Sequence, residues 1–75
     1  MLTDNEVYRK IKEISARYIN PRTPVYISSL TQELYSNIEL LTPLINHLIE
    51  LRLIKYDEKI KYSVRLTFLG MNVNR

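Results

Sequence analysis

The chain contains no cysteine and has a single glycine among its 75 residues. Without cysteine there are no disulfides, no thiolate chemistry and no cysteine-based zinc site. Because a secreted domain this small usually depends on disulfides, the composition favours a cytoplasmic protein. A lone glycine argues against a glycine-rich phosphate-binding loop. No run approaches the roughly eighteen apolar residues of a membrane span. The first residues also lack the basic and apolar regions of a secretory signal.

The residues that are present make an ordinary globular composition with a small excess of positive charge. Hydrophobic residues account for 45% of the chain and charged residues for 25%. This length allows one domain, which we place over residues 1–75. Eleven Lys and Arg residues against eight Asp and Glu residues give a net charge of +3. That charge allows a polyanionic partner, but many soluble proteins carry as much without one.

The first half of the chain predicts two helices with a short strand between them. Thr3 and Glu6 have the spacing of a capping box, and apolar residues then recur at helical intervals up to Tyr18. We therefore expect a helix over residues 4–19 that stops before Pro21. Residues 25–27 are β-prone and predict a short strand. A second helix is expected over residues 29–35, with Ser28 or Ser29 as its cap.

The third helix is the most informative segment, and we expect it over residues 38–52. Thr42 followed by Pro43 has the pattern of a helix start, with residues 38–41 as a lead-in turn. Its apolar residues occupy one wide arc, which predicts deep packing in a small core. The opposite arc is polar and consists of Thr42, Pro43, Asn46, His47 and Glu50.

After the third helix, the hydrophobic period changes from that of a helix to that of a strand. Residues 54–57 and 60–66 predict two strands joined by a turn near Asp57. Ile60, Tyr62, Val64 and Leu66 alternate with Lys59, Lys61, Ser63 and Arg65, which indicates a half-buried strand with a cationic outer face. Residues 67–75 form a tail with one or two helical turns, capped by Thr67. The expected fold class is α+β, mainly helical, with three helices and a β-hairpin wing.

Two motifs resemble the winged helix-turn-helix domains of PadR-like and MarR-like transcriptional regulators. The first is the leucine-rich third helix that ends in Leu51-Arg52-Leu53-Ile54, and the second is Leu66-Thr67-Phe68-Leu69-Gly70. The chain departs from the family pattern in two places. Arg52 replaces the usual glycine, and the segment after Gly70 is shorter than the long dimerisation helix of many such regulators. The resemblance implies a duplex-DNA-binding domain that acts as a small transcriptional regulator.

By this resemblance, the third helix enters the major groove, where Thr42, Pro43, Asn46 and His47 would face the bases. Lys55, Lys59, Lys61 and Arg65 of the wing would contact phosphates. Ser28 and Ser29 are secondary phosphate candidates at the start of the second helix. The alternative is a protein-binding module that never contacts DNA, because the polar arc of the third helix carries Glu50 and no lysine or arginine.

Other classes of function find no support in the sequence. We expect no enzymatic activity, because no nucleophile, metal cluster or phosphate loop can be assigned. His47 is the only histidine, so a metal site is not expected, and no cofactor or small-molecule ligand is indicated. We interpret the six tyrosines mainly as packing residues. The apolar residues of the tail either fold back on the core or form a homodimer surface; they are Phe68, Leu69, Met71 and Val73.

Overall fold

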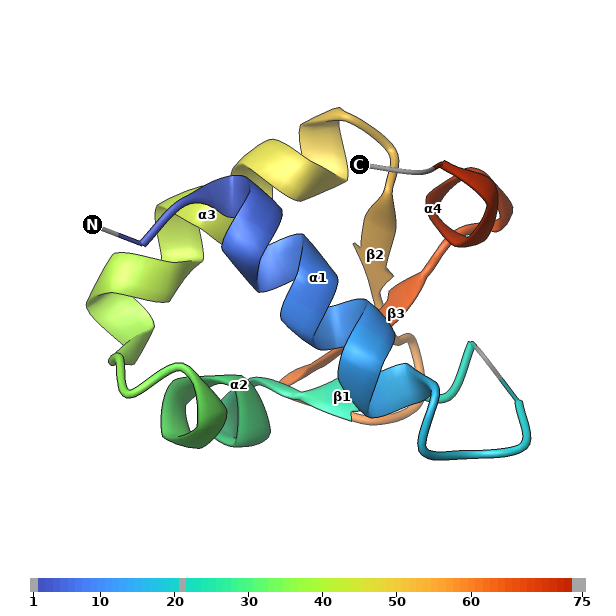
Figure 1. The fold of residues 1–75 in the computed structure, drawn as a ribbon, viewed down its shortest axis with the longest axis horizontal. Helices are drawn as coiled ribbons and strands as arrows, with labels where there is room; N and C mark the ends of the chain where they lie inside the picture. The colour runs from blue at the N-terminus through green and yellow to red at the C-terminus, as the bar shows by residue number, and fades with distance from the viewer. Residues whose placement is uncertain (1, 21, 74–75) are drawn as a thin grey trace.

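The computed structural model describes residues 2–20 and 22–73. In chain order, its elements are α1 (Asp4–Ser15), β1 (Val25–Tyr26), α2 (Ile27–Glu33), α3 (Ile38–Glu50), β2 (Ile54–Tyr56), β3 (Ser63–Leu66) and α4 (Phe68–Asn72). The fold is α+β and mainly helical, with a winged-helix-like topology in which the hairpin follows the three main helices (Figure 1). This confirms the predicted fold class. Pro21 and the last two residues of the predicted tail lie outside the described residues.

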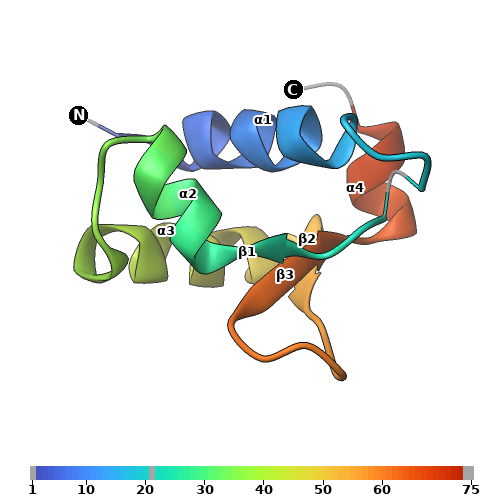
Figure 2. The ribbon, with the colours of Figure 1, turned by 90° about the horizontal axis from the view of Figure 1, so that it is seen from below.

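The core lies between α1 on one side and α3 with the sheet on the other (Figure 2). Each helix contributes its apolar stripe, as the helical periodicity predicts. Tyr8 is also fully buried, and its hydroxyl donates to the carbonyl oxygens of Gly70 and Val73. Through these hydrogen bonds, α1 also fixes the C-terminal segment against the core. The largest fully buried apolar side chains are Tyr8, Ile11, Leu30, Leu41, Ile45, Leu48 and Ile54.

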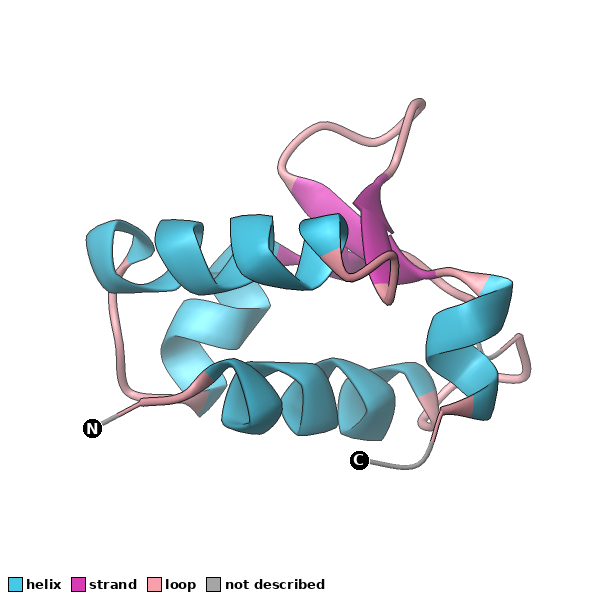
Figure 3. Ribbon diagram, turned by 90° about the horizontal axis from the view of Figure 1, so that it is seen from above, coloured by secondary structure: helices cyan, strands magenta, loops and turns pink. Residues whose placement is uncertain are grey.

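β3 is the central strand of a three-stranded antiparallel sheet with the order β1-β3-β2. Val25 of β1 pairs with Val64, and Ile54 of β2 pairs with Leu66. The short β1 strand therefore ties the hairpin to the helices. We call residues 54–66, which comprise β2, the turn and β3, the wing. Figures 2 and 3 show its turn projecting beyond α3, on the side of the molecule away from α1.

α1 begins as predicted but ends four residues earlier than expected. The Thr3 side chain accepts a hydrogen bond from the Glu6 N–H, so the predicted cap is confirmed. After Ser15 the chain tightens into turns, in which the Arg17 and Tyr18 N–H groups bond three residues back. This change in direction carries Tyr18 out of the apolar stripe, and its side chain is exposed. The prediction that Tyr18 continues the buried face is therefore wrong.

α2 begins at Ile27, so neither Ser28 nor Ser29 is its N-cap. Tyr26 occupies the cap position and makes no side-chain cap bond, while both serines lie within the first turn. The predicted serine cap is wrong because β1 ends at Tyr26 and the chain enters the helix directly. Arg17 forms a bidentate ion pair with Glu33, with N–O distances of 2.8 and 2.7 Å. This pair joins the end of α1 to α2 and holds the pKa of Glu33 below its usual value.

α3 begins at Ile38 and not at Pro43. The Asn37 side chain accepts from the Leu40 N–H at 3.0 Å and supplies the N-cap. Pro43 lies inside the helix, and the Thr42 hydroxyl donates to the Ile38 carbonyl instead of capping. Thr42-Pro43 is therefore not a helix start. The cap at Asn37 places the first residue of the helix at Ile38, which agrees with the predicted range but not with its predicted cap.

The strands of the wing are shorter than predicted, because Tyr62 interrupts the alternation. Tyr62 has a φ of 59°, which lies in the left-handed region, so β3 begins only at Ser63. Val64 and Leu66 face the core as expected, whereas Ile60 and Tyr62 are exposed and Ser63 is buried. In the sequence, apolar and polar residues alternate without a break through Tyr62, but the backbone turns at that residue. The residues between β2 and β3 form a long turn.

The tail carries α4, and Thr67 caps it as predicted by accepting from the Gly70 N–H. The Thr67 hydroxyl also donates to the Arg52 carbonyl, and its N–H bonds the Leu53 carbonyl at 3.1 Å. These bonds join α4 to the chain that leaves α3. The alternative in which the tail folds back on the core is confirmed in part. Met71 and Val73 pack against the core, whereas Phe68 and Leu69 remain exposed.

Candidate nucleic-acid interface

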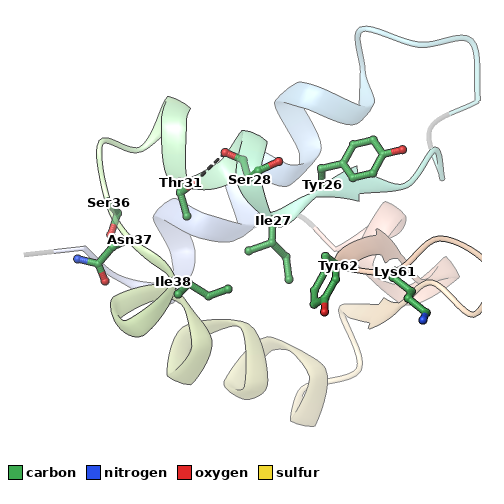
Figure 4. Close-up of a pocket in the computed structure, with 9 residues that line it drawn as sticks. All are labelled: Tyr26, Ile27, Ser28, Thr31, Ser36, Asn37, Ile38, Lys61 and Tyr62. Atoms are coloured by element: carbon green, nitrogen blue, oxygen red, sulfur yellow. Dashed lines mark hydrogen bonds between the residues drawn. The ribbon is translucent and has the colours of Figure 1, made fainter.

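A groove runs between the wing, the start of α2 and the first turns of α3 (Figure 4). Its larger part has a volume of about 680 Å³. Ile27 and Ile38 line it from the two helices, and Tyr62 lines it from the wing. The further lining residues include Tyr26, Ser28, Thr31, Asn37, Thr42, Tyr56 and Lys61. The groove therefore brings Ser28, Thr42 and Lys61 together, three residues that the sequence selected separately.

The polar arc of α3 is divided between two sides of the helix. Thr42 lines the groove, and Asn46 lies on the same side, where the Tyr56 hydroxyl is 3.4 Å from its Oδ1. Pro43 is exposed next to them. His47 lies on the α1 side of the helix, and its Nδ1 is 2.8 Å from Oδ2 of Asp4. The structure thus groups Thr42 and Asn46 with the wing and places His47 apart from them.

The cations of the wing also separate into two groups. Lys59 and Lys61 are exposed in the turn, and Lys61 borders the groove. Lys55 is exposed on another side of β2, where it lines a second groove with Arg52 and Phe68. Arg65 is half-buried and pairs with Asp57 at 3.3 Å, so its guanidinium supports the wing. Lys61 is therefore the wing cation best placed for a partner that meets α3, while Lys59 lies further along the turn in a hollow that Lys55 also lines.

Asp57 organises the turn that presents these lysines. Its Oδ1 accepts from the N–H groups of Lys59 and Ile60, each at 2.8 Å, and its Oδ2 pairs with Arg65. The hydrogen bonds from Ile60 and Lys59, together with the Arg65 charge, hold the pKa of Asp57 below its usual value. Asp57 therefore stays ionised and fixes the turn at neutral pH.

The tyrosines are the main feature that the sequence prediction missed. Tyr8 is buried, but Tyr18, Tyr26, Tyr35, Tyr56 and Tyr62 are exposed, so the general interpretation as packing residues is wrong. Tyr56 and Tyr62 border the groove. One signal for this was available in the composition, with six tyrosines against one phenylalanine. Tyrosine is enriched at interfaces because it combines an apolar ring with a polar tip.

The outward face of α3 is polar but acidic. Glu39 and Glu50 are exposed on it, and none of its described residues is lysine or arginine. Ser29 is half-buried in α2 and is not among the residues that line the groove. Positive charge at this face therefore comes from the wing. A polyanion that contacts α3 would have to approach from the wing side of the helix.

In residues 2–20 and 22–73, no three His, Cys, Asp or Glu side chains gather in a group able to hold a metal ion. Within the same residues, no helix has the length and apolar character to cross a bilayer. Comparison of the chain with protein-family models, curated proteins and solved structures gave no match.

Proposed function

We propose that this domain binds duplex DNA as a small transcriptional regulator in the cytoplasm. α3 lies in the major groove with Thr42 and Asn46 toward the bases, and Lys59 and Lys61 of the wing contact the phosphates. The main support is spatial. Thr42, Asn46 and Lys61 come from two separate elements yet border one side of the molecule. Winged helix-turn-helix proteins bind through this combination of helix and wing.

The chemistry of the two elements predicts different contributions. Asparagine pairs bidentately with adenine, and threonine contacts the thymine methyl group. The Tyr56 hydroxyl beside Oδ1 of Asn46 limits the orientation of that amide. The wing lysines provide attraction that does not depend on sequence. Since α3 carries no cation on its outward face, the wing supplies most of the affinity and α3 supplies modest selectivity.

Fluorescence anisotropy with a mixed-sequence duplex, measured at low and then moderate salt, tests the proposal. We expect binding that weakens linearly in a plot of log affinity against log salt. Replacing Lys59 and Lys61 together by alanine should weaken binding to all sequences and lower the slope by about two, because two phosphate contacts are lost. The control replaces Arg9 and Lys10, which removes equal charge from α1 on the opposite side, together with the ion pair between Lys10 and Glu13.

Two outcomes of this experiment contradict the proposal. Absence of binding at low salt would exclude duplex DNA as the partner. An equal loss in the Arg9/Lys10 control would mean that overall charge matters and that the wing has no special role. Asn46→Ala separates the role of α3, since we expect it to reduce discrimination at one base pair by about 1–3 kcal/mol.

One observation favours a second function, which is a protein-binding module. The exposed Glu39 and Glu50 would repel phosphate, whereas a basic protein surface would accept them. If the duplex experiment fails, this function becomes the leading one.

A two-fold DNA site would also favour a homodimer, for which the exposed Phe68 and Leu69 are the proposed contact.

A further inference from the structure

Tyr62 is exposed at a position where the backbone is strained. Its φ of 59° is unfavourable for a residue with a side chain, and its side chain is 77% exposed. Neighbouring bonds hold this conformation in place. The Tyr62 carbonyl accepts from the Ile27 N–H at 2.9 Å, and the Ser63 hydroxyl donates to the Ile60 carbonyl at 2.7 Å. A glycine at this position would adopt the same backbone conformation without strain. The presence of an exposed tyrosine there therefore points to a function of its side chain.

The Tyr62 side chain lines the groove on the side of the wing. Figure 4 shows the side chains of Ile38 and Tyr62 on either side of Ile27, with Lys61 beside the tyrosine. The groove volume of about 680 Å³ is in the range of ligand sites. Lys61 is the one charged residue among the described residues that line the groove, and none of them is acidic. The occupant that this lining fits has a flat apolar body and a negative charge.

We propose that this groove binds an unpaired nucleobase of single-stranded DNA, which stacks on Tyr62 with Ile38 opposite it, while Lys61 contacts the adjoining phosphate. Every base has an aromatic face, so stacking tolerates all sequences, and a lysine beside the ring tracks the backbone. An apolar small molecule would gain nothing from Lys61. A negatively charged protein segment would use the ring only where an aromatic or proline side chain lies next to its charge, whereas every nucleotide carries both a flat ring and a charge. The site goes beyond duplex binding, because a base within an intact duplex cannot enter it.

The test is the affinity for a fluorescein-labelled oligothymidine of about 10 nucleotides, measured by anisotropy at low salt. Replacing Tyr62 by alanine should lower the affinity by about 5- to 150-fold, since it removes one stacked base. Tyr35→Ala is the matched control. Tyr35 is also exposed, at 97%, and also left-handed, with a φ of 51°, but it is not among the residues that line the groove. We expect this control to bind like the wild type.

Two more variants separate stacking from other roles of Tyr62. Tyr62→Phe keeps the ring and should retain affinity within about twofold, whereas Lys61→Ala should lower the salt slope by about one. Circular dichroism checks that each variant is folded. Quenching of tyrosine fluorescence in the wild type, reduced in Tyr62→Ala, reports stacking directly. Equal losses in Tyr62→Ala and Tyr35→Ala, or a full loss in Tyr62→Phe, would overturn the proposal.

The outcomes also separate this site from the proposed duplex function. Binding of the single strand without binding of duplex would leave the groove site standing and remove the duplex proposal. Binding of duplex without measurable binding of oligothymidine would overturn the groove site alone. If Tyr62→Ala loses the single strand and keeps the duplex, both proposals are supported, with Lys61 shared and Tyr62 needed for the single strand alone.

Discussion

Among the described residues, Tyr35, Arg52 and Tyr62 adopt left-handed backbone conformations without being glycine. Tyr35 and Arg52 follow α2 and α3, where a left-handed residue closes the helix. After α3, the Leu53 N–H bonds the Leu48 carbonyl and the Arg52 N–H bonds the Ile49 carbonyl. This pair of bonds is the Schellman motif, in which glycine is usual. The replacement of glycine by Arg52, noted in the sequence, is thus a place where the chain accepts strain.

Arg52→Gly should therefore stabilise the domain. Glycine removes the clash of Cβ at a φ of 63° but increases the freedom of the unfolded chain, so we expect a net gain of about 1 kcal/mol. Urea denaturation measures the change. Arg52→Ala is the control, since it removes the same charge and keeps Cβ. If both variants gain equally, the arginine side chain and not the backbone is responsible.

Gly70 should tolerate no side chain. A Cβ at this position would lie 1.9 Å from the Leu53 carbonyl oxygen, which is fixed backbone. Gly70→Ala forces α4 away from the end of α3, and we expect a loss of about 1–3 kcal/mol in the free energy of unfolding. Asn72→Ala, on the exposed side of α4, should change it by less than about 0.5 kcal/mol. A Gly70→Ala variant as stable as the wild type would show that α4 does not pack as described.

At the level of the elements, the wing turn depends on one carboxylate. The folded-state pKa of Asp57 lies below the usual value of about 3.9, so ionised Asp57 favours the folded turn. The stabilisation of the folded turn by ionised Asp57 is present in full at pH values above the pKa of Asp57 in the unfolded chain. It is lost as the pH falls through the lower pKa of Asp57 in the folded chain. We expect the Lys59 and Ile60 amide NMR shifts to titrate together below pH of about 3.9. Asp57→Asn should remove this titration. A midpoint at or above the usual pKa in the wild type would contradict the assignment.

Element order was predictable because each segment carries its own hydrophobic period. The capping residues of α1 and α4 were predictable as well, since Thr3 and Thr67 act within three residues along the chain. The first residue of α3 was harder to predict, because Asn37 and Thr42 are both good helix caps and only the tertiary structure selects between them. The left-handed turn at Tyr62 was not predictable, since it depends on a hydrogen bond to Ile27, far along the chain.

At the level of the whole molecule, the candidate face is assembled from three segments distant in the sequence. The sequence identified Thr42, Asn46 and Lys61 individually, but not that Tyr62, Ile27 and Ile38 join them in one groove. It also grouped His47 with Asn46, whereas packing of α1 against α3 places His47 beside Asp4. Which polar residues share a side depends on how the helices pack, and a single amphipathic pattern does not contain that information.

The central claim is that duplex DNA meets the face formed by α3 and the wing. Two-dimensional ¹⁵N NMR of this 75-residue chain, titrated with a mixed-sequence duplex, tests it residue by residue. We predict that the largest amide shift changes fall on Thr42, Asn46, Lys59 and Lys61, with α1 little affected. Changes confined to α1 or to α4, or no changes at low salt, would contradict the account.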